Sequence, residues 1–351
     1  MSSEPQSPPV PATHHVRRKR YAGSHPRQFA DKYKELNSEE FADDMQKVIA
    51  RGQTPASTHR PICVDEMLAI LKPVAGEIAL DVTLGFGGHT QAILPKLLPG
   101  GRLFGTDVDS VERPRTEARL RALGYGEDVL TIREMNFANV ATLLADVPSG
   151  FDCILADFGV SSMQLDNPER GFSYKNDGPL DLRLNPTKGA PASYALQKLS
   201  AYELTQLLSD IADEPHAARI AYGIKRSKTI IKTTLQLAEN VRASLADFPD
   251  KDDHKKTLAR TFMALRIQVN NEFGVIDRFL ADLPKCMKSG GRVAVLSFHS
   301  GEDKRIENAF QRYLEECLFS AISKDCIRPS QEEQRSNSRS MPARLRWAVK
   351  A

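Results

Sequence analysis

The chain has 351 residues, 41% of them hydrophobic and 26% charged, which is enough for one large or two smaller domains with a buried core. Its formal net charge of +3 is too small to indicate nucleic-acid binding by itself. No apolar run is long enough for a membrane helix or a signal peptide, so we expect a cytoplasmic protein without a membrane partner. The five cysteines are scattered without a CxxC pair, which predicts reduced packing residues and no metal site.

Residues 1–36 are poor in large apolar side chains and rich in Pro, Ser, Arg and His, with the basic run HHVRRKR at 14–20. Such a composition cannot build a packed core, so it predicts a disordered basic extension. Both a passive tail and an arm that grips RNA phosphates fit this segment. An organellar transit peptide fits less well, because Glu4 and several prolines interrupt any amphipathic helix.

Residues 37–165 are expected to form the first part of an α/β domain, in which helices and strands alternate from residue 62 onward. The predicted strands are 78–81, 102–107, 129–133 and 153–157, with helices to about residue 71 and over 90–97 and 110–123. Strands separated by helices of this length are typical of a doubly wound, mostly parallel sheet with helices on both faces. Ligands bind such sheets at the C-terminal ends of the strands.

Residues 166–255 interrupt this pattern with helices and loops, which predicts an inserted helical subdomain. Residues 256–351 then form the second part of the α/β domain. An apolar stripe at steps of three and four predicts one long helix over about 257–287, ended by Gly290 and Gly291. The apolar run 292–298 predicts a further buried strand, after which His299 begins another helix.

The run DVTLGFGGH at 81–89 indicates a strand that ends in a glycine-rich cofactor loop. Gly85, Gly87 and Gly88 allow a tight turn and a close approach of the backbone to a ligand. A dinucleotide loop would have a third glycine where Thr90 stands. S-adenosylmethionine, which has no phosphate, suits the acidic strand end better. An ordinary strand-turn-helix corner also fits this loop taken alone.

Three acidic residues stand at the C-terminal ends of predicted strands, namely Asp81, Asp107 and Asp157. Because these ends meet at one crevice, we expect the three carboxylates to surround a polar ligand. Asp107 follows the glycine loop by about twenty residues, a spacing typical of a ribose-binding acid. Its alternative role is a helix N-cap, which Asp109 or Ser110 would fill better. Phe137, after the third strand, fits either adenine stacking or the core.

Six blocks of sequence resemble the RsmH (MraW) family of 16S ribosomal RNA cytosine N4-methyltransferases. They occur in the family's order over residues 59–351 and read HRPICVDEML, DVTLGFGGHT, DFGVSSMQLDNPERGFSYKNDGPLDLR, FMALRIQVNNE, GGRVAVLSFHSGED and NSRSMPARLR. The chain departs from the family pattern at Phe158, at Gly301 and at Met341-Pro342, and the last departure puts one RNA contact in doubt.

The resemblance implies a class I (Rossmann-like) methyltransferase whose insertion, residues 166–255, recognises RNA. It also implies that S-adenosyl-L-methionine is the cofactor, with small-subunit ribosomal RNA or the assembled small ribosomal subunit as partner. The implied cofactor-binding residues are Gly87, Gly88, His89, Asp107, Phe137, Asp157 and Gln164. The target is then the exocyclic N4 amine of a cytosine at the decoding centre. A homodimer is compatible with the sequence.

Asp157 and His299 are the candidate catalytic residues. The N4 amine of cytosine is a poor nucleophile, so an acceptor such as Asp157 would localise its lone pair and later take its proton. His299 would face the same crevice and orient the substrate, although an ordinary hydrogen-bonded histidine fits equally well. Phe158, Phe172 or Tyr174 would stack on a flipped base or would simply pack.

Three other functions remain open at this point. A nicotinamide-dependent oxidoreductase could use the same kind of sheet, although Thr90 argues against it. A non-catalytic ribosome-assembly factor could bind S-adenosylmethionine and RNA without transferring a methyl group. A DNA amino methyltransferase is disfavoured, because DFGV at 157–160 lacks the prolines of the usual (D/N)PP(Y/F) loop.

Overall fold

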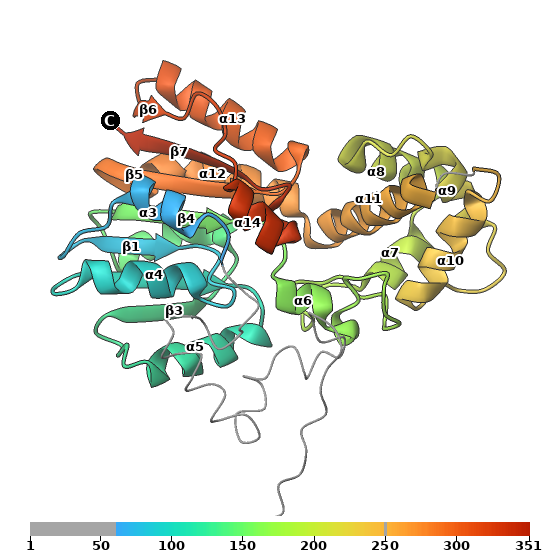
Figure 1. Ribbon diagram of the computed structural model, residues 1–351, viewed down its shortest axis with the longest axis horizontal. Coiled ribbons are helices and arrows are strands. Elements are labelled where there is room, and N and C mark those ends of the chain that lie inside the picture. Colours follow the sequence, from blue (N-terminus) through green and yellow to red (C-terminus); the bar gives the residue numbers. More distant parts are fainter. Residues whose placement is uncertain (1–60, 249–250) are drawn as a thin grey trace, which may run out of the picture. The chain divides into compact units, whose positions relative to one another are not determined.

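The protein is described from a computed structural model, which covers residues 61–248 and 251–351 (Figure 1). The predicted N-terminal extension, residues 1–36, lies outside the described residues. Within the described ranges, no helix is long and apolar enough to cross a membrane.

A seven-stranded sheet has the order β3-β2-β1-β4-β5-β7-β6. Its strands are β1 (Ile78–Asp81), β2 (Arg102–Asp107), β3 (Leu130–Glu134), β4 (Phe151–Asp157), β5 (Met287–Ser297), β6 (Phe319–Ile322) and β7 (Arg344–Lys350). Strands β1 to β5 are parallel, and β7 pairs antiparallel with both β5 and β6. The prediction of a doubly wound, mostly parallel sheet is therefore confirmed, and the C-terminal ends of β1, β2 and β4 lie next to one another.

Helices cover both faces of the sheet (Figure 1). One face packs against α3 (Val64–Leu71), α4 (Gly88–Leu97) and α5 (Glu112–Ala122), and the other against η2 (Phe137–Ala145), α12 (Glu272–Cys286) and α13 (Ser300–Glu315). Strand β4 shows how the sequence serves both layers, because Cys153 and Leu155 join the first core whereas Ile154 and Ala156 join the second. This alternation makes the strand apolar throughout, as expected for a buried parallel strand.

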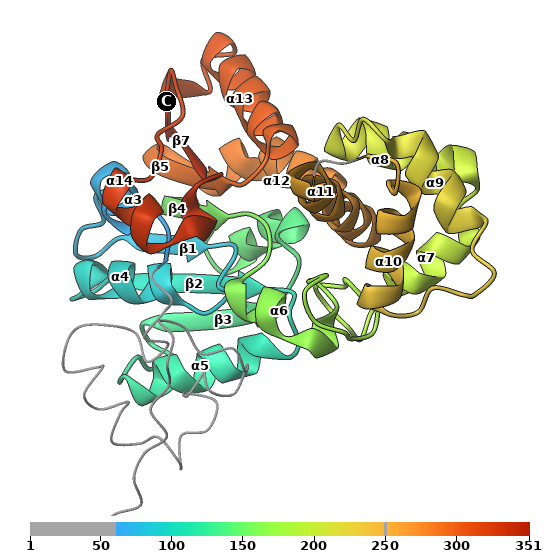
Figure 2. The same cartoon turned by 45° about the vertical axis from the view of Figure 1, so that its right-hand side comes forward.

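The insertion has a hydrophobic core of its own. Figure 2 shows its helices grouped together. It contains α7 (Ala192–Lys198), α8 (Ala201–Ala212), α9 (Ala217–Lys225), α10 (Thr234–Ser244) and α11 (Lys251–Asn270). Capping boxes begin α8 at Ser200 and α10 at Thr233. Leu258, Phe262 and Leu265 of α11 belong to this core, so the packing of the insertion continues past residue 255. The division of the chain at 255 stays a prediction.

The prediction of one helix over 257–287 is wrong, because the chain forms two helices, α11 and α12. Asn271 separates them in the left-handed conformation, with φ 49° and ψ 42°. The apolar stripe runs on across the break in sequence, but α11 packs in the insertion and α12 packs on the sheet. The predicted end at Gly290 is wrong as well, since β5 starts at Met287 and contains both glycines.

Four short helical segments lie in the loops between strands. They are α6 (Ser162–Asp166), η3 (Pro168–Arg170), α14 (Gln331–Ser336) and η4 (Ser338–Ser340). Arg339 of η4 bonds Asp166 of α6 at 2.6 and 3.2 Å, which joins the C-terminal segment to the loop that follows β4.

Candidate cofactor and substrate site

The glycine loop between β1 and α4 has the backbone that its sequence predicts. Gly85 and Gly87 have φ values of 48° and 71°, which favour glycine, and a Cβ on Gly88 would lie 2.3 Å from Cγ of Pro61. Asp81 accepts hydrogen bonds from the Thr83 amide (3.1 Å) and the Thr90 hydroxyl (2.7 Å). Its carboxylate therefore holds the loop in shape instead of facing a ligand, and burial raises its pKa to about 6.

Asp107 joins this loop to the end of β2. It accepts hydrogen bonds from the amides of Gly85 (2.7 Å) and Asp109 (2.8 Å), and burial raises its pKa to about 6. Asp109, and not Asp107, accepts hydrogen bonds at the start of α5, from the amides of Val111 (2.8 Å) and Glu112 (3.0 Å). Each carboxylate oxygen of Asp107 accepts one of the two hydrogen bonds from Gly85 and Asp109, so each keeps a lone pair for a further donor.

Asp157, at the end of β4, has a carboxylate oxygen without a hydrogen-bond partner in the described part of the chain. Its Oδ1 is shielded from solvent and accepts no hydrogen bond from the described residues, although the side chain as a whole is 30% exposed. Burial, followed by the charges of Asp81 and Glu302, raises its pKa to about 8. A buried acceptor without a donor costs free energy, so the site suits a ligand that brings an N–H group or a positive charge.

His89 lies beside Asp157, with 3.9 Å between Nδ1 and the Asp157 Oδ2. Its Nε2 is 3.0 Å from the carbonyl of Ile62, which can only accept, so Nε2 carries the proton. Burial lowers the pKa of His89, which keeps the ring neutral and leaves the lone pair of Nδ1 toward Asp157. His89 therefore supplies no compensating positive charge to the carboxylate.

Phe137 is half-buried among aromatic rings. It stacks on Phe158 with centroids 5.3 Å apart and meets Phe279 edge-on at 5.6 Å. Phe158 is only 3% exposed and Phe172 only 5%, while Tyr174 contacts Phe262 inside the insertion. Phe158 and Phe172 pack in hydrophobic cores, so neither is free to stack on a base, whereas Phe137 and Tyr174 are only partly buried and each keeps an exposed part.

Gln164 is occupied by protein contacts at both ends of its amide. Its Oε1 accepts from the Ser161 amide in the capping box of α6 (2.8 Å), and its Nε2 donates to Asp109 (2.6 Å). Arg170 donates to the same oxygen of Asp109 (2.8 Å) and to the carbonyl of Leu184 (2.8 Å). Asp109 and Arg170, 1% and 5% exposed, thus connect the loop after β2 to the insertion.

The role of Asp109 and Arg170 was not predicted. The two residues are 61 positions apart, and no local periodicity marks such a pair. The only available signal was an aspartate two residues beyond the end of a strand, which the sequence offered merely as a helix cap.

His299 begins α13 and has protein partners on both ring nitrogens. Nδ1 accepts from the Gly301 amide (3.2 Å), and Nε2 lies 3.0 Å from Glu302 Oε1, close enough for an ion pair although not aligned as a hydrogen bond. Against burial, which has the largest effect, His299 and Arg266 hold the pKa of Glu302 below its ordinary value. Among the described residues no direct contact joins His299 to Asp157. The two strand ends are nevertheless adjacent, since a Cβ on Gly159 would lie 3.7 Å from Phe298.

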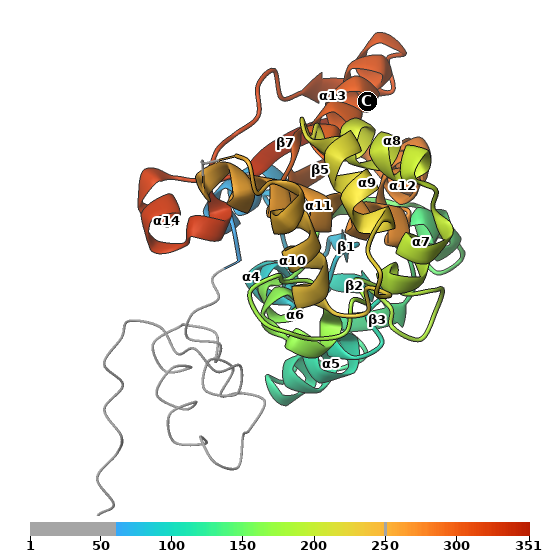
Figure 3. The ribbon, with the colours of Figure 1, turned by 90° about the vertical axis from the view of Figure 1, so that its right-hand side faces the viewer.

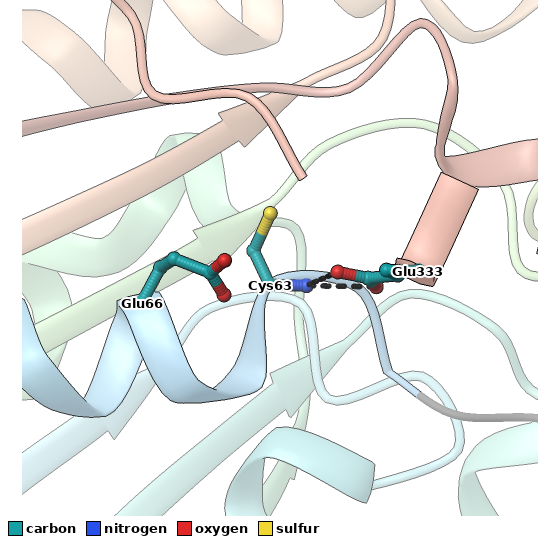
Figure 4. Close-up of side chains that lie close together, drawn as sticks. All are labelled: Cys63, Glu66 and Glu333. Carbon is teal, nitrogen blue, oxygen red and sulfur yellow. Dashed lines mark hydrogen bonds between the residues drawn. The ribbon is translucent and has the colours of Figure 1, made fainter. Parts of the chain in front are cut away.

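Cys63, Glu66 and Glu333 are grouped closely enough to be considered as metal ligands (Figure 4). Glu333 accepts from the amide of Cys63 at 3.1 and 3.3 Å, which stabilises the left-handed residue before α3. Burial and the two nearby carboxylates raise the pKa of the Cys63 thiol to about 12, so it stays protonated at neutral pH. A helix start thus accounts for the cluster without a metal ion, and the absence of a metal site stays a prediction.

This sheet order, the antiparallel β7, the glycine loop after β1 and the carboxylates at the ends of β2 and β4 together define a class I (Rossmann-like) methyltransferase. The profile of the MraW methylase family matches residues 56–351, and the chain belongs to this family. It is therefore an enzyme that uses S-adenosylmethionine, and the nicotinamide-dependent oxidoreductase is excluded. The open acceptor of Asp157 and the bare backbone at Gly85 fit such a cofactor.

Two relatives cover nearly the whole chain. The chain is 50% identical over 342 residues to "Ribosomal RNA small subunit methyltransferase H 2" of Alkaliphilus metalliredigens, covering 95% of this chain and 97% of that protein. It is 47% identical over 343 residues to "Ribosomal RNA small subunit methyltransferase H 1" of Agathobacter rectalis, covering 96% and 98%. Both similarities reach into the N-terminal segment, beyond the residue 59 at which the six blocks begin.

Proposed function

We propose that this enzyme methylates the exocyclic N4 amine of a decoding-centre cytosine in small-subunit (16S) ribosomal RNA. The names of its relatives, which match nearly end to end, support a small-subunit RNA substrate. The six sequence blocks support the N4 amine of cytosine. The proposed partner is the RNA or the assembled small ribosomal subunit, met in the cytoplasm, and a homodimer remains a prediction.

The observation that carries the proposed chemistry is the unpartnered Oδ1 of Asp157. An amine nucleophile needs an acceptor for its N–H, and this oxygen is an acceptor at the end of β4 without a donor among the described residues. Burial makes the carboxylate more basic than an ordinary aspartate. Both properties favour Asp157 as the group that receives the proton of the cytosine amine.

When bound, S-adenosylmethionine supplies an electrophilic methyl group on a positively charged sulfonium. Asp157 accepts a hydrogen bond from the amine, which localises the nitrogen lone pair, and then takes the proton as the new bond forms. The neutral His89 beside it leaves this basicity intact, because it brings no positive charge. We propose that His299 acts indirectly, through Glu302. His299 contacts Glu302, and the charge of Glu302 helps to raise the pKa of Asp157.

The proposed cofactor contacts combine the glycine loop with an acidic side chain that keeps free lone pairs and a ring that is only partly buried. Gly87, Gly88 and His89 form the loop end and helix start, Asp107 keeps lone pairs for the ribose hydroxyls, and Phe137 keeps an exposed part of its ring for the adenine. Gln164 fits a positioning role better than direct contact, because its amide already holds α6 and Asp109.

The test incubates the full chain and labelled S-adenosylmethionine with naked small-subunit RNA, assembled small subunits or duplex DNA, followed by nucleoside analysis. We expect label only in N4-methylcytidine from RNA or subunits. Asp157→Asn should lose transfer even when the cofactor is present at a saturating concentration, and Glu127→Gln, an exposed acid before β3, serves as the matched control.

The alternatives predict different products. Label in DNA would indicate an amino methyltransferase of DNA. Cofactor and RNA binding by the unaltered chain without any transfer would leave a non-catalytic assembly factor, and label in another nucleoside would reject N4 of cytosine as the target.

A further inference from the structure

Three exposed tyrosines stand out on the insertion. Within the described residues, the exposed large aromatic side chains are those of Tyr194, Tyr202 and Tyr222, and their exposed fractions are 49, 73 and 62%. They lie on α7, α8 and α9, whose packing is seen in Figure 3. An aromatic ring that faces water loses the stabilisation that burial would give it, so three on one subdomain need an explanation.

The ends of these three helices meet around one lysine. Lys225, at the end of α9, donates from Nζ to the carbonyl of Leu196 and to that of Gln197 (3.4 Å), at the end of α7. The charge of Glu203, at the start of α8, also acts on Lys225. The helix ends that carry the three tyrosines therefore lie close together in the insertion.

Each tyrosine lies within one turn of this junction. Tyr222 precedes Lys225 by three residues, and Tyr202 is the neighbour of Glu203. Tyr194 lies one turn before Lys198, whose Nζ is 5.4 Å from the centre of the tyrosine ring. We call Tyr194, Lys198, Tyr202, Tyr222, Lys225 and Arg226 the tyrosine platform.

The charge of the tyrosine platform is positive. Lys198 and Arg226 are exposed, and Lys225 is half-buried against α7. The acid at the junction is Glu203, whose side chain completes the capping box of α8. Its negative charge also interacts with the positive charge of Lys225. Exposed rings interleaved with cations are typical of surfaces that bind unpaired nucleic acid, where bases stack on the rings and phosphates meet the cations.

We propose that the tyrosine platform binds an unpaired stretch of the RNA substrate. Bases stack on Tyr202 and Tyr222, the most exposed rings, and Lys198 and Arg226 contact the phosphates. This assignment rests on the proposed RNA function and adds to it the surface that holds the RNA outside the methyl-transfer crevice. Tyrosine also occurs at protein interfaces, but there the surrounding charges are depleted, whereas here they are retained.

The experiment measures the binding of a labelled single-stranded RNA of about 12 nucleotides, a length within the range of such sites. Tyr202→Ala combined with Tyr222→Ala should weaken binding about tenfold or more, because each stacked base depends on its ring. The paired Phe variants should bind like the parent, because phenylalanine keeps the stacking face. Lys198→Gln should reduce the slope of log affinity against log salt concentration by about one, as expected for the loss of one phosphate contact. Lys96→Gln, at an exposed lysine of α4, is the control.

The same samples are tested for cofactor binding and for thermal stability, both of which should stay unchanged in the Ala variants. RNA binding equal to the parent, or equal losses in the Ala and Phe variants, would refute stacking. Normal binding of naked RNA together with weaker binding of assembled subunits would assign the surface to a ribosomal protein instead. Failure of the unaltered chain to bind any RNA would contradict the proposed function itself, which separates the two ideas.

Discussion

The affinity for S-adenosylmethionine should rise steeply with pH. In the free protein, burial raises the pKa of Asp157 to about 8 and those of Asp81 and Asp107 to about 6. A positively charged ligand favours the ionised carboxylates, so binding must release the protons that they hold at lower pH. Between about pH 6 and about pH 8, Asp157 is the carboxylate that contributes most to this release.

The size of the effect follows from the pKa values. Each unit by which the bound ligand lowers the pKa of Asp157 from its value of about 8 strengthens binding of the ionised form, relative to the protonated form, by about 1.4 kcal/mol. Solvent contact of the 30% exposed side chain moderates this effect. We therefore expect the affinity to rise by about ten- to a hundredfold over this pH range.

Calorimetric titration in buffers of different ionisation enthalpy measures both the affinity and the number of protons released. S-adenosylhomocysteine is the matched ligand, because it carries the same groups without the sulfonium charge, and its affinity should change less with pH. Asp157→Asn should remove most of the difference between the two ligands. The same pH profile for both ligands, or proton uptake on binding, would refute the assignment of a raised pKa to Asp157.

Three further perturbations test the geometry of the site and its supports. Asp107→Ala should cost about 1.5–3 kcal/mol of cofactor binding by calorimetry, the usual loss of charged hydrogen bonds, and unchanged affinity would contradict ribose binding. Gly88→Ala should destabilise the fold by about 1–3 kcal/mol in urea unfolding, since its Cβ would overlap the Pro61 ring. Arg170→Gln should lower the free energy of unfolding by about 3–5 kcal/mol, because it leaves the buried carboxylate of Asp109 without its ion-pair partner. Arg133→Gln, which breaks an exposed ion pair, should lower it by less than about 1 kcal/mol. Equal losses in the two variants would show that the buried pair has no special role.

The parallel strands could be predicted closely because each is a short apolar run between polar segments. The expected ranges 78–81 and 102–107 are those of β1 and β2. The same periodicity misled at α11 and α12, because the apolar steps continue through Asn271 although the helix does not. A hydrophobic stripe indicates that one face of a helix is buried, but it does not indicate which hydrophobic core that face packs against.

The acidic residues of the site show a second limit. Their positions at strand ends were predictable, but their orientations depend on donors supplied by the folded loops. Asp81 is satisfied by Thr83 and Thr90, whereas Asp157 keeps an open oxygen. The contact of Asp109 with Arg170 spans 61 positions and arises only when the insertion packs beside the sheet.

Asn271 is the single residue between α11 and α12, so a change in its backbone angles would alter the angle between the two helices. The 20 residues of α11 span about 30 Å, and Phe279, which touches Phe137, lies only about 12 Å along α12 from the same point. A rotation of about 10° at Asn271 would thus displace the far end of α11 by about 5 Å and Phe279 by about 2 Å. Asparagine tolerates the left-handed conformation while keeping more backbone stiffness than glycine. A change in the angle between the two helices at Asn271 would therefore move the far end of α11 about 2.5 times as far as Phe279 in the core beside the sheet.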